Sequence, residues 1–165
     1  MATAYLGLGS NLGNRLAFLR GGRDCLVSRF DITLLHCSGV YESAAVGGPA
    51  DSPPYLNAVL QIETSLSPRD LLAACLAVED DFGRTRPRVW APRTLDIDLL
   101  LYGEILIDEP DLRIPHPRLP ERAFVLVPLS EIAPDQVHPV RRQTIRAMVE
   151  ALPPGSDLVP IRATW

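Results

Sequence analysis

Residues 93–102 read RTLDIDLLLY, which alternates acidic and apolar side chains before it becomes wholly apolar. Successive side chains of a β-strand point to opposite faces of its sheet, so Asp96 and Asp98 project together. Ile97 and the leucines on either side of it project the other way, into a core. We therefore expect a strand over residues 94–102 that buries one face and carries two carboxylates on the other.

The two carboxylates indicate a metal site. Like charges on one face repel each other, and burying them without partners is costly. A divalent cation removes this conflict, and oxygen ligands without cysteine or histidine suit magnesium better than zinc. The alternative is a solvated strand face that bears two surface acids. Arg93 just before the pair and the apolar run after it favour the metal site, so we expect Asp96 and Asp98 to hold Mg²⁺.

Strand and helix signals alternate along the rest of the chain. Ser67, Pro68 and Asp70 form the clearest helix start, with an N-cap, a proline suited to the first turn and an acid at the positive end of the dipole. Neighbouring strands are joined too tightly for parallel crossovers, which favours an α+β sandwich with an antiparallel or mixed sheet and helices packed on it. Strands are predicted over residues 3–9, 32–41, 57–63, 94–102, 105–108 and 158–161, and helices over residues 14–30, 67–83, 121–132 and 144–152.

Length and composition fit one folded domain over residues 1–165, because 47% hydrophobic and 22% charged residues are ordinary for a globular protein. The net charge of −4 offers no electrostatic footprint for nucleic acid or an anionic membrane. No apolar stretch approaches membrane-spanning length, and no secretory signal is visible in the first residues. The odd number of widely spaced cysteines, Cys25, Cys37 and Cys75, indicates reduced core residues. We expect a cytoplasmic monomer.

All 16 basic residues are arginines. The absence of lysine excludes a P-loop, Schiff-base chemistry and a protein-kinase type of site. Any phosphate must therefore be bound by arginine, whose planar fork suits phosphate oxygens. Four arginines and a tryptophan lie in one predicted loop over residues 84–93, which we expect to fold over a triphosphate; a plain basic surface loop is the alternative. These residues are Arg84, Arg86, Arg88, Trp90 and Arg93.

Three further positions are candidates, each with a plain structural alternative. His116 lies between two prolines that limit its backbone freedom, which suits a preset donor to phosphate, although a lone loop histidine is usually structural. Tyr55 and Asn57 could stack on a ring and bind its polar edge, or could simply pack at the start of a strand. The glycines of residues 7–13 have G-x-G-x-x-x-G spacing, which is not the dinucleotide-binding fingerprint, so we reject that interpretation.

Four segments resemble, in order, the blocks of the hydroxymethyldihydropterin pyrophosphokinase family. They read AYLGLGSNLGNR from residue 4, YLNAV from residue 55, WAPRTLDIDLLLYG from residue 90 and IPHPRLPERAFVLVPL from residue 114. The likeness runs from Ala4 to about Pro134, and the tail beyond Asp135 carries little of it. It implies a ferredoxin-like α+β sandwich and the transfer of pyrophosphate from ATP to 6-hydroxymethyl-7,8-dihydropterin in folate biosynthesis, with AMP as the second product.

The resemblance also implies roles for individual residues. Asp96 and Asp98 match the ligands of two Mg²⁺ ions, and together with Arg84, Arg93 and His116 they match the catalytic group. The pterin site would comprise Ser43, Val46, Tyr55, Asn57, Trp90 and Phe124. The ATP site would comprise Glu79, Arg84, Arg86, Arg93, Leu99, His116 and Arg122. Arg88 is left without a role, and the departures from the family pattern at Ala44, Ala45, Val89, Ala91 and Pro120 do not touch the metal ligands.

Two other functions stay open from the residues alone. Aspartate–metal sites also serve hydrolases and transferases that act on other phosphoanhydrides, so the carboxylate pair does not choose between them. A ferredoxin-like RNA-binding module would need aromatic residues on the sheet face and a basic surface. The net charge and the acidic strand argue against the module.

Overall fold

The computed structural model describes residues 1–44, 53–83, 94–155 and 158–165. In this part of the chain the main sheet has six strands in the order β5-β1-β4-β3-β8, with β2 pairing with β4, and every pairing is antiparallel. The strands are β1 (Ala2–Ser10), β2 (Ile32–Cys37), β3 (Val40–Ser43), β4 (Tyr55–Thr64), β5 (Asp96–Tyr102) and β8 (Leu158–Arg162). A separate hairpin pairs β6 (Ile107–Glu109) with β7 (Leu112–Ile114).

Two split β-α-β units build this sheet. Strands β1 and β2 are both antiparallel to β4, which lies between them, and α1 (Arg15–Val27) connects them. Strands β4 and β5 are likewise both antiparallel to β1, and α2 (Pro68–Asp81) connects them. This is the ferredoxin-like arrangement. The predicted α+β sandwich is confirmed.

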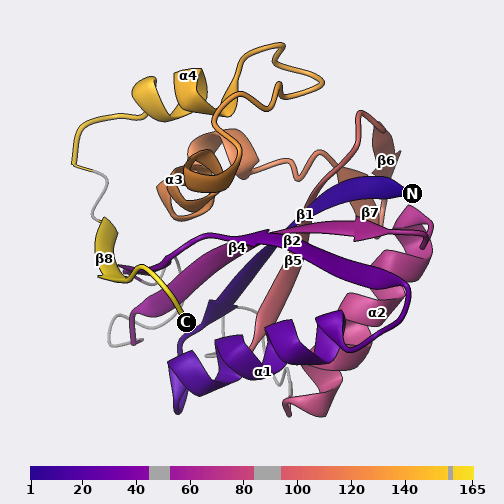
Figure 1. Cartoon of the computed structure of the whole chain (residues 1–165). Helices are drawn as coiled ribbons and strands as arrows, with labels where there is room; N and C mark the ends of the chain where they lie inside the picture. Colours follow the sequence, from indigo (N-terminus) through magenta and orange to yellow (C-terminus); the bar gives the residue numbers. More distant parts are fainter. Residues whose placement is uncertain (45–52, 84–93, 156–157) are drawn as a thin grey trace.

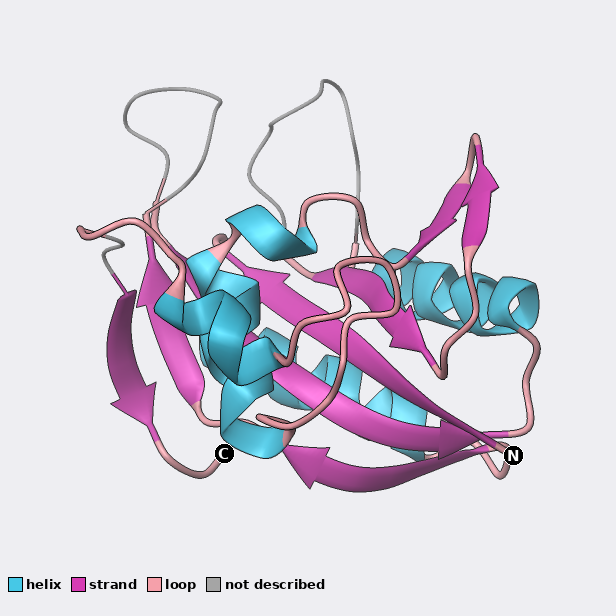
Figure 2. Cartoon of the chain, turned by 90° about the horizontal axis from the view of Figure 1, so that it is seen from above, coloured by secondary structure: helices cyan, strands magenta, loops and turns pink. Residues whose placement is uncertain are grey.

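Helices cover both faces of the sheet. Figure 1 shows α1 and α2 on one face and α3 (Ala123–Ile132) and α4 (Ile145–Glu150) on the other. A short 3₁₀ turn, Leu119–Glu121, leads into α3. Figure 2 shows the same layers from above, with the β6–β7 hairpin standing apart from the main sheet. The molecule is therefore a three-layer stack in which one sheet serves two apolar interfaces.

Side-chain caps fix where three of the helices begin. Asn14, Ser67 and Thr144 each accept a hydrogen bond from the backbone N–H three residues later, at 3.1 Å. Such a cap satisfies one of the four N–H groups that lack a partner inside the helix. The predicted starts at residues 14, 67 and 144 are confirmed within one residue. The predicted helix over residues 14–30 ends earlier, at Val27.

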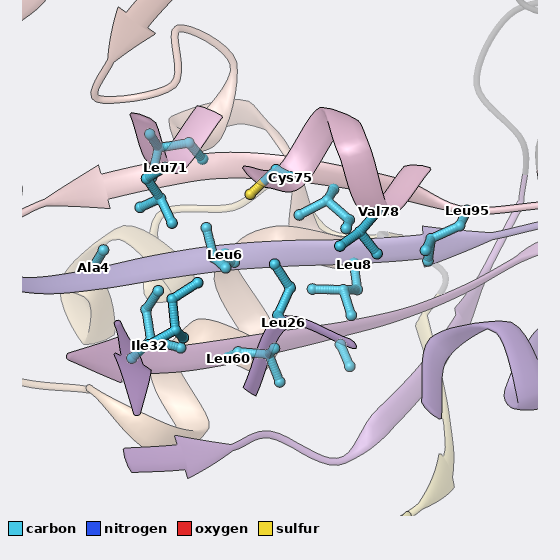
Figure 3. Close-up of a cluster of buried hydrophobic side chains, with 14 of the residues drawn as sticks. Ala4, Leu6, Leu8, Leu26, Ile32, Leu60, Leu71, Cys75, Val78 and Leu95 are labelled. Atoms are coloured by element: carbon cyan, nitrogen blue, oxygen red, sulfur yellow. The ribbon is translucent and has the colours of Figure 1, made fainter. Parts of the chain in front are cut away.

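Each face of the sheet has its own apolar cluster. Leu6 and Leu8 of β1 pack with Leu71, Val78 and other residues of the α1–α2 layer, as Figure 3 shows. The second cluster lies on the other face of the sheet, under α3 and α4. It contains Tyr5, Val59, Leu100 and Leu101 of the strands and Leu126 and Leu129 of α3. The apolar strands are thus buried on both sides, and this burial stabilises the sandwich.

Two glycines inside α1 let the helices approach each other and the sheet closely. A Cβ at Gly21 would lie 2.5 Å from the Phe82 ring, and one at Gly22 would lie 2.7 Å from a Leu95 methyl group. Both distances are shorter than real Cβ contacts. The glycine pair weakens the helix by its intrinsic propensity, and close packing explains why it is nevertheless present.

Two strand predictions were wrong in detail. The predicted strand over residues 32–41 is interrupted at Ser38–Gly39, where the Ser38 hydroxyl accepts the hydrogen bond of Val59 N–H at 2.8 Å. Gly39 fits only without a side chain, because a Cβ there would lie 2.7 Å from the carbonyl oxygen of Arg162. The prediction over residues 105–108 also missed β7, the partner strand that closes the hairpin.

The cysteines are free, as predicted. Cys75 is buried, and this burial raises the pKa of its thiol to about 12, so it is an inert core residue. Cys25 and Cys37 are only half-buried, although both pack against the first apolar cluster. No helix in the described ranges is long and apolar enough to cross a membrane.

We expect His138 to make the fold sensitive to acid. Its buried ring accepts two hydrogen bonds at Nδ1, from the N–H groups of Val140 at 3.2 Å and Arg141 at 3.0 Å. Burial and, after it, the charge of Arg141 lower the pKa of His138. The unfolded chain therefore binds more protons as the pH falls below the ordinary value of 6.5, and the free energy of unfolding falls with it.

We expect His138→Asn to make this loss of stability less steep. The Asn Oδ1 can take the place of Nδ1 as acceptor but does not titrate. Urea unfolding of both proteins between pH 8 and about pH 5 measures the difference. Equal slopes would contradict the assignment to His138, because His116 titrates in both proteins.

Candidate active site

Four strands bring polar side chains together at one end of the sheet. On β5, Asp96 and Asp98 lie opposite Gly9 and Gly7 of β1, and Gly9 also lies opposite Asn57 of β4. Directly paired residues share a face of the sheet, so the carboxylates, the glycines and Asn57 face the same way. This is the face that α3 and α4 cover further along, away from α1 and α2.

Strand β5 presents its two carboxylates as the sequence predicts. Asp96 and Asp98 are half-buried, whereas Leu95, Ile97 and Leu99 are at most 6% exposed and pack in the α1–α2 cluster. The predicted orientation of the pair is confirmed. One further contact fixes the strand at this point, since Glu79 of α2 accepts the hydrogen bond of Ile97 N–H at 2.7 Å. Helix α2 therefore holds the backbone between the two aspartates.

Gly9 leaves a strip of bare backbone between the carboxylates and Asn57. A Cβ at Gly9 would lie 3.4 Å from the Tyr55 ring and 3.7 Å from Asn57 Oδ1, which are ordinary contact distances. The fold therefore tolerates a small side chain here, and close packing does not explain the glycine. Glycine within a strand often marks a place where a ligand comes close to the backbone.

Strands β3 and β4 form the other side of this strip. Asn57 is 4% exposed, and its Nδ2 donates to Ser43 Oγ at 2.8 Å and to the carbonyl of Tyr41 at 3.3 Å. These bonds hold the carboxamide in one orientation. Tyr55 lies two residues earlier on the same face. The structure thus brings Ser43, Tyr55 and Asn57 together, as predicted.

His116 and Arg122 lie within electrostatic range of Asp98. Burial lowers the pKa of His116, Arg122 and Arg118 lower it further, and the charge of Asp98 opposes them. His116 Nδ1 accepts the hydrogen bond of Arg118 N–H at 3.2 Å, so in the neutral ring Nε2 carries the proton. Its backbone N–H is bound to the carbonyl of Leu100 at 3.0 Å. The histidine is thus fixed to β5 as a donor beside the carboxylates.

Arg122 completes this group at the start of α3. Burial lowers the pKa of its guanidinium, while Asp98 acts in the opposite direction; arginine stays charged in either case. The guanidinium lies 5.3 Å from the centroid of the Phe124 ring, within cation–π range. A cation, an aromatic ring and two carboxylates therefore gather where α3 begins.

The remaining predicted site residues fall into two groups. Leu99 of β5 and Glu79 of α2 are buried on the α1–α2 side of the sheet, so any contact of theirs with ATP would not be made on the carboxylate face. Their assignment to the ATP site stays a prediction. Five predicted site residues lie outside the residues that the structure describes: Val46, Arg84, Arg86, Trp90 and Arg93.

Sequence reasoning missed residues that support the site rather than form it. Asn11 donates to the carbonyl of Pro53 at 3.2 Å, and Arg15 donates to the carbonyl of Pro54 at 3.0 Å. Both contacts fasten the chain just before β4. Arg118 is the third such residue, through its N–H bond to His116. All three lie inside the segments that resemble the pyrophosphokinase family, but their residue type and spacing did not predict these contacts.

The donor set fits magnesium. In the described ranges no three His, Cys, Asp or Glu residues are placed to hold a metal ion between them. A site with two carboxylates is nevertheless what Mg²⁺ uses when substrate phosphates and water supply its other ligands. The oxygen-only pair therefore suits a metal that arrives together with a phosphate substrate.

Known proteins with related sequences share one description. The model of the 7,8-dihydro-6-hydroxymethylpterin-pyrophosphokinase (HPPK) family matches residues 5–134. A 2-amino-4-hydroxy-6-hydroxymethyldihydropteridine pyrophosphokinase from Synechocystis sp. is 45% identical over 147 residues, which cover 89% of this chain and 74% of the relative. The protein of the same description from Methylorubrum extorquens is 42% identical over 155 residues, 94% of this chain and 96% of the relative.

A solved structure shares the fold at low sequence identity. The crystal structure of wild-type HPPK-DHPS from Plasmodium falciparum has a TM-score of 0.71 to this chain at 15% identity. The match covers 90% of this chain but only 44% of the longer one. This likeness independently supports the α+β architecture.

Proposed function

Because the chain belongs to the 7,8-dihydro-6-hydroxymethylpterin-pyrophosphokinase family, we propose that the sheet face described above carries out pyrophosphate transfer for folate biosynthesis. The hydroxymethyl oxygen of the pterin attacks the β-phosphorus of ATP in line and gives up its proton, the bond from that phosphorus to the α-phosphate oxygen breaks, and AMP leaves. One observation carries the assignment of residues. The carboxylate pair lies across a single glycine-bearing strand from Asn57, so two different ligands can meet over Gly9.

The pterin is assigned to the β3–β4 side. The orientation of Asn57 is fixed by Ser43, which suits recognition of the polar edge of a ring. Tyr55 beside Gly9 and Phe124 at the start of α3 supply aromatic faces for stacking. Val46 and Trp90 join this group by resemblance alone.

The phosphates of ATP are assigned to the β5 side. Asp96 and Asp98 would hold two Mg²⁺ ions, which neutralise phosphate charge and lower the pKa of the pterin alcohol. His116 and Arg122 donate hydrogen bonds to the phosphoryl oxygens, and their partial burial strengthens this action because water screens it less. Resemblance adds Arg84, Arg86 and Arg93 to the phosphate contacts, and Glu79 and Leu99 to the nucleotide site.

Calorimetric titration tests this assignment. We expect the pterin to bind tightly only when Mg²⁺ and a non-hydrolysable ATP analogue are already bound. The physical reason is that the two ligands share one sheet face, so the first orders groups that the second contacts. Equal pterin affinity with and without the nucleotide would contradict the shared site.

A turnover assay separates this function from the hydrolase alternative. With ATP and Mg²⁺ alone we expect no AMP, and with the pterin added we expect AMP and the pterin diphosphate in equal amounts. Release of phosphate or pyrophosphate without the pterin would favour a hydrolase. A matched reaction without Mg²⁺ serves as the control and should be inactive.

We further infer a single domain over residues 1–165 that works as a monomer in the cytoplasm. Two observations support the single domain and the compartment. Both apolar clusters share one sheet, so neither layer has a core of its own. The three free cysteines also suit a reducing compartment.

A further inference from the structure

Glu131, near the end of α3, binds Tyr41 of strand β3 and Gly39 just before that strand. Its carboxylate accepts the N–H of Gly39 with both oxygens, at 3.1 and 3.0 Å, and accepts the Tyr41 hydroxyl at 2.6 Å. The residues joined are about ninety positions apart in the sequence. Hydrogen bonds to an ionised carboxylate are stronger than those between neutral groups, so this is a strong local tie even though Glu131 is exposed.

The tie acts on the strand that orients Asn57. Tyr41 lies directly opposite Asn57, and its carbonyl accepts the hydrogen bond of Asn57 Nδ2 at 3.3 Å. Two residues further on, Ser43 accepts the second bond of the same amide group at 2.8 Å. A shift of β3 would therefore turn the Asn57 carboxamide. The Tyr41–Glu131 hydrogen bond fixes β3 next to this point.

The same helix carries the opposite wall of the site. Phe124 and the neighbouring Arg122 lie at the start of α3, whereas Glu131 lies in its last turn. Between them, Leu126 and Leu129 are completely buried on the sheet, so the helix cannot easily slide or tilt. The position of Glu131 is thus coupled to that of Phe124. Fixing its carboxylate to β3 sets the separation between Phe124 and Asn57.

The kink before β3 gives the carboxylate its second contact. At Ser38–Gly39 the chain leaves the β2 register, and Gly39 N–H turns toward α3, where Glu131 accepts its bond. Any side chain at residue 39 would meet the Arg162 carbonyl at 2.7 Å, so β8 holds the kink from the other side. Burial and the bond to Glu131 raise the pKa of Tyr41 to about 12, so its hydroxyl stays a donor at neutral pH.

We propose that Glu131 and Tyr41 are positioning residues for the pterin: their hydrogen bond fastens α3 to β3 and so holds Phe124 at stacking distance from the ring that Asn57 orients. This inference rests on the proposed function of the Ser43–Asn57 side as the pterin site. Neither residue touches the reacting atoms. Both act through the placement of others.

Tyr41→Phe and Glu131→Gln test the proposal, since both keep the shape of the side chain. With Mg²⁺ and a non-hydrolysable ATP analogue present, we expect each to weaken pterin binding roughly five- to tenfold, because Tyr41→Phe deletes the hydrogen bond and Glu131→Gln removes the charge that strengthens it. The affinity for the nucleotide itself should fall much less than that for the pterin, because Asp96, Asp98 and His116 hold the phosphates without α3, which supplies only Arg122 among the described phosphate contacts. The double variant should be little weaker than the Glu131→Gln variant, because both changes weaken the Tyr41–Glu131 contact and only Glu131→Gln also affects the contact with Gly39.

Tyr5→Phe is the matched control. Its hydroxyl donates to Gln136 at 3.4 Å and accepts from Gln61 at 3.1 Å, so it also ties the sheet to the α3–α4 layer, but away from Asn57. We expect Tyr5→Phe to lower the thermal unfolding midpoint about as much as Tyr41→Phe does, without changing the pterin affinity. A merely structural role for Glu131 and Tyr41 would give the same pattern as this control.

Two outcomes would overturn the proposal, and they are distinguishable. If the wild-type protein binds the pterin but both variants bind it equally well, or lose nucleotide and pterin affinity in parallel, the positioning role is wrong and the proposed function stands. If the wild-type protein itself does not bind the pterin in the presence of nucleotide, the proposed site falls and the positioning role falls with it.

Discussion

Replacing Asp96 or Asp98 with asparagine should lower kcat by about a thousandfold, and replacing both should leave no measurable turnover. Asparagine keeps the shape of the side chain but removes the negative charge that holds a divalent cation against the phosphates. The two carboxylates face the same way on β5, so neither can replace the other without moving the strand. Steady-state measurement of pterin-dependent AMP formation at saturating ATP gives the result.

The control for these variants is Asp108→Asn on β6. Its side chain is 91% exposed, and its ion pair with Arg113 is long at 3.4 Å, so the variant makes the same chemical change away from the site. Raising the Mg²⁺ concentration should partly restore the single variants, because the remaining carboxylate still binds the ion weakly. Full activity in the double variant, with an unchanged unfolding midpoint, would show that the carboxylates do not hold the metal.

Local sequence patterns predicted the parts of the fold that local physics controls. The alternation around Ile97 fixed which side chains of β5 face together, because the strand period is two whatever surrounds it. Capping residues such as Ser67 marked helix starts for the same reason. The interruption at Ser38–Gly39 could not be found this way. It depends on Val59 and Arg162, which are remote in the sequence and adjacent only after folding.

The candidate site likewise has a part that local spacing predicted and a part that depends on tertiary contacts. The pair Asp96 and Asp98 could be inferred from spacing, whereas His116 owed its assignment to the resemblance rather than to its own surroundings. Its approach to Asp98 requires the chain to return from β7 and bind the edge of β5 through the carbonyl of Leu100. The contacts of Glu131 were missed for a related reason. An exposed glutamate near a helix end is ordinary, and only the tertiary structure shows that it meets Gly39 and Tyr41.

Gly9→Ala is expected to weaken pterin binding by roughly fivefold to more than a hundredfold, the range that corresponds to about 1–3 kcal/mol of steric conflict. The new methyl group would stand on the bare strip beside Tyr55 and Asn57, where the proposed ring lies. It would contact the protein itself only at ordinary distances, 3.4 and 3.7 Å. Because alanine also restricts the unfolded chain more than glycine does, the free energy of unfolding should stay equal or rise slightly. Calorimetry with the nucleotide analogue and urea unfolding measure the two effects.

Gly7→Ala makes the same change two residues earlier on the same face and isolates the role of position. Its methyl group would meet Leu100 at 3.5 Å and lies opposite Asp98 rather than Asp96, further from Asn57. The loss of pterin affinity should therefore be clearly smaller than for Gly9→Ala. If both variants bind the pterin as the wild type does, the strip of backbone over Gly9 is not where the ring lies. The pterin would then bind away from Asn57, even if the carboxylate pair still holds the metal.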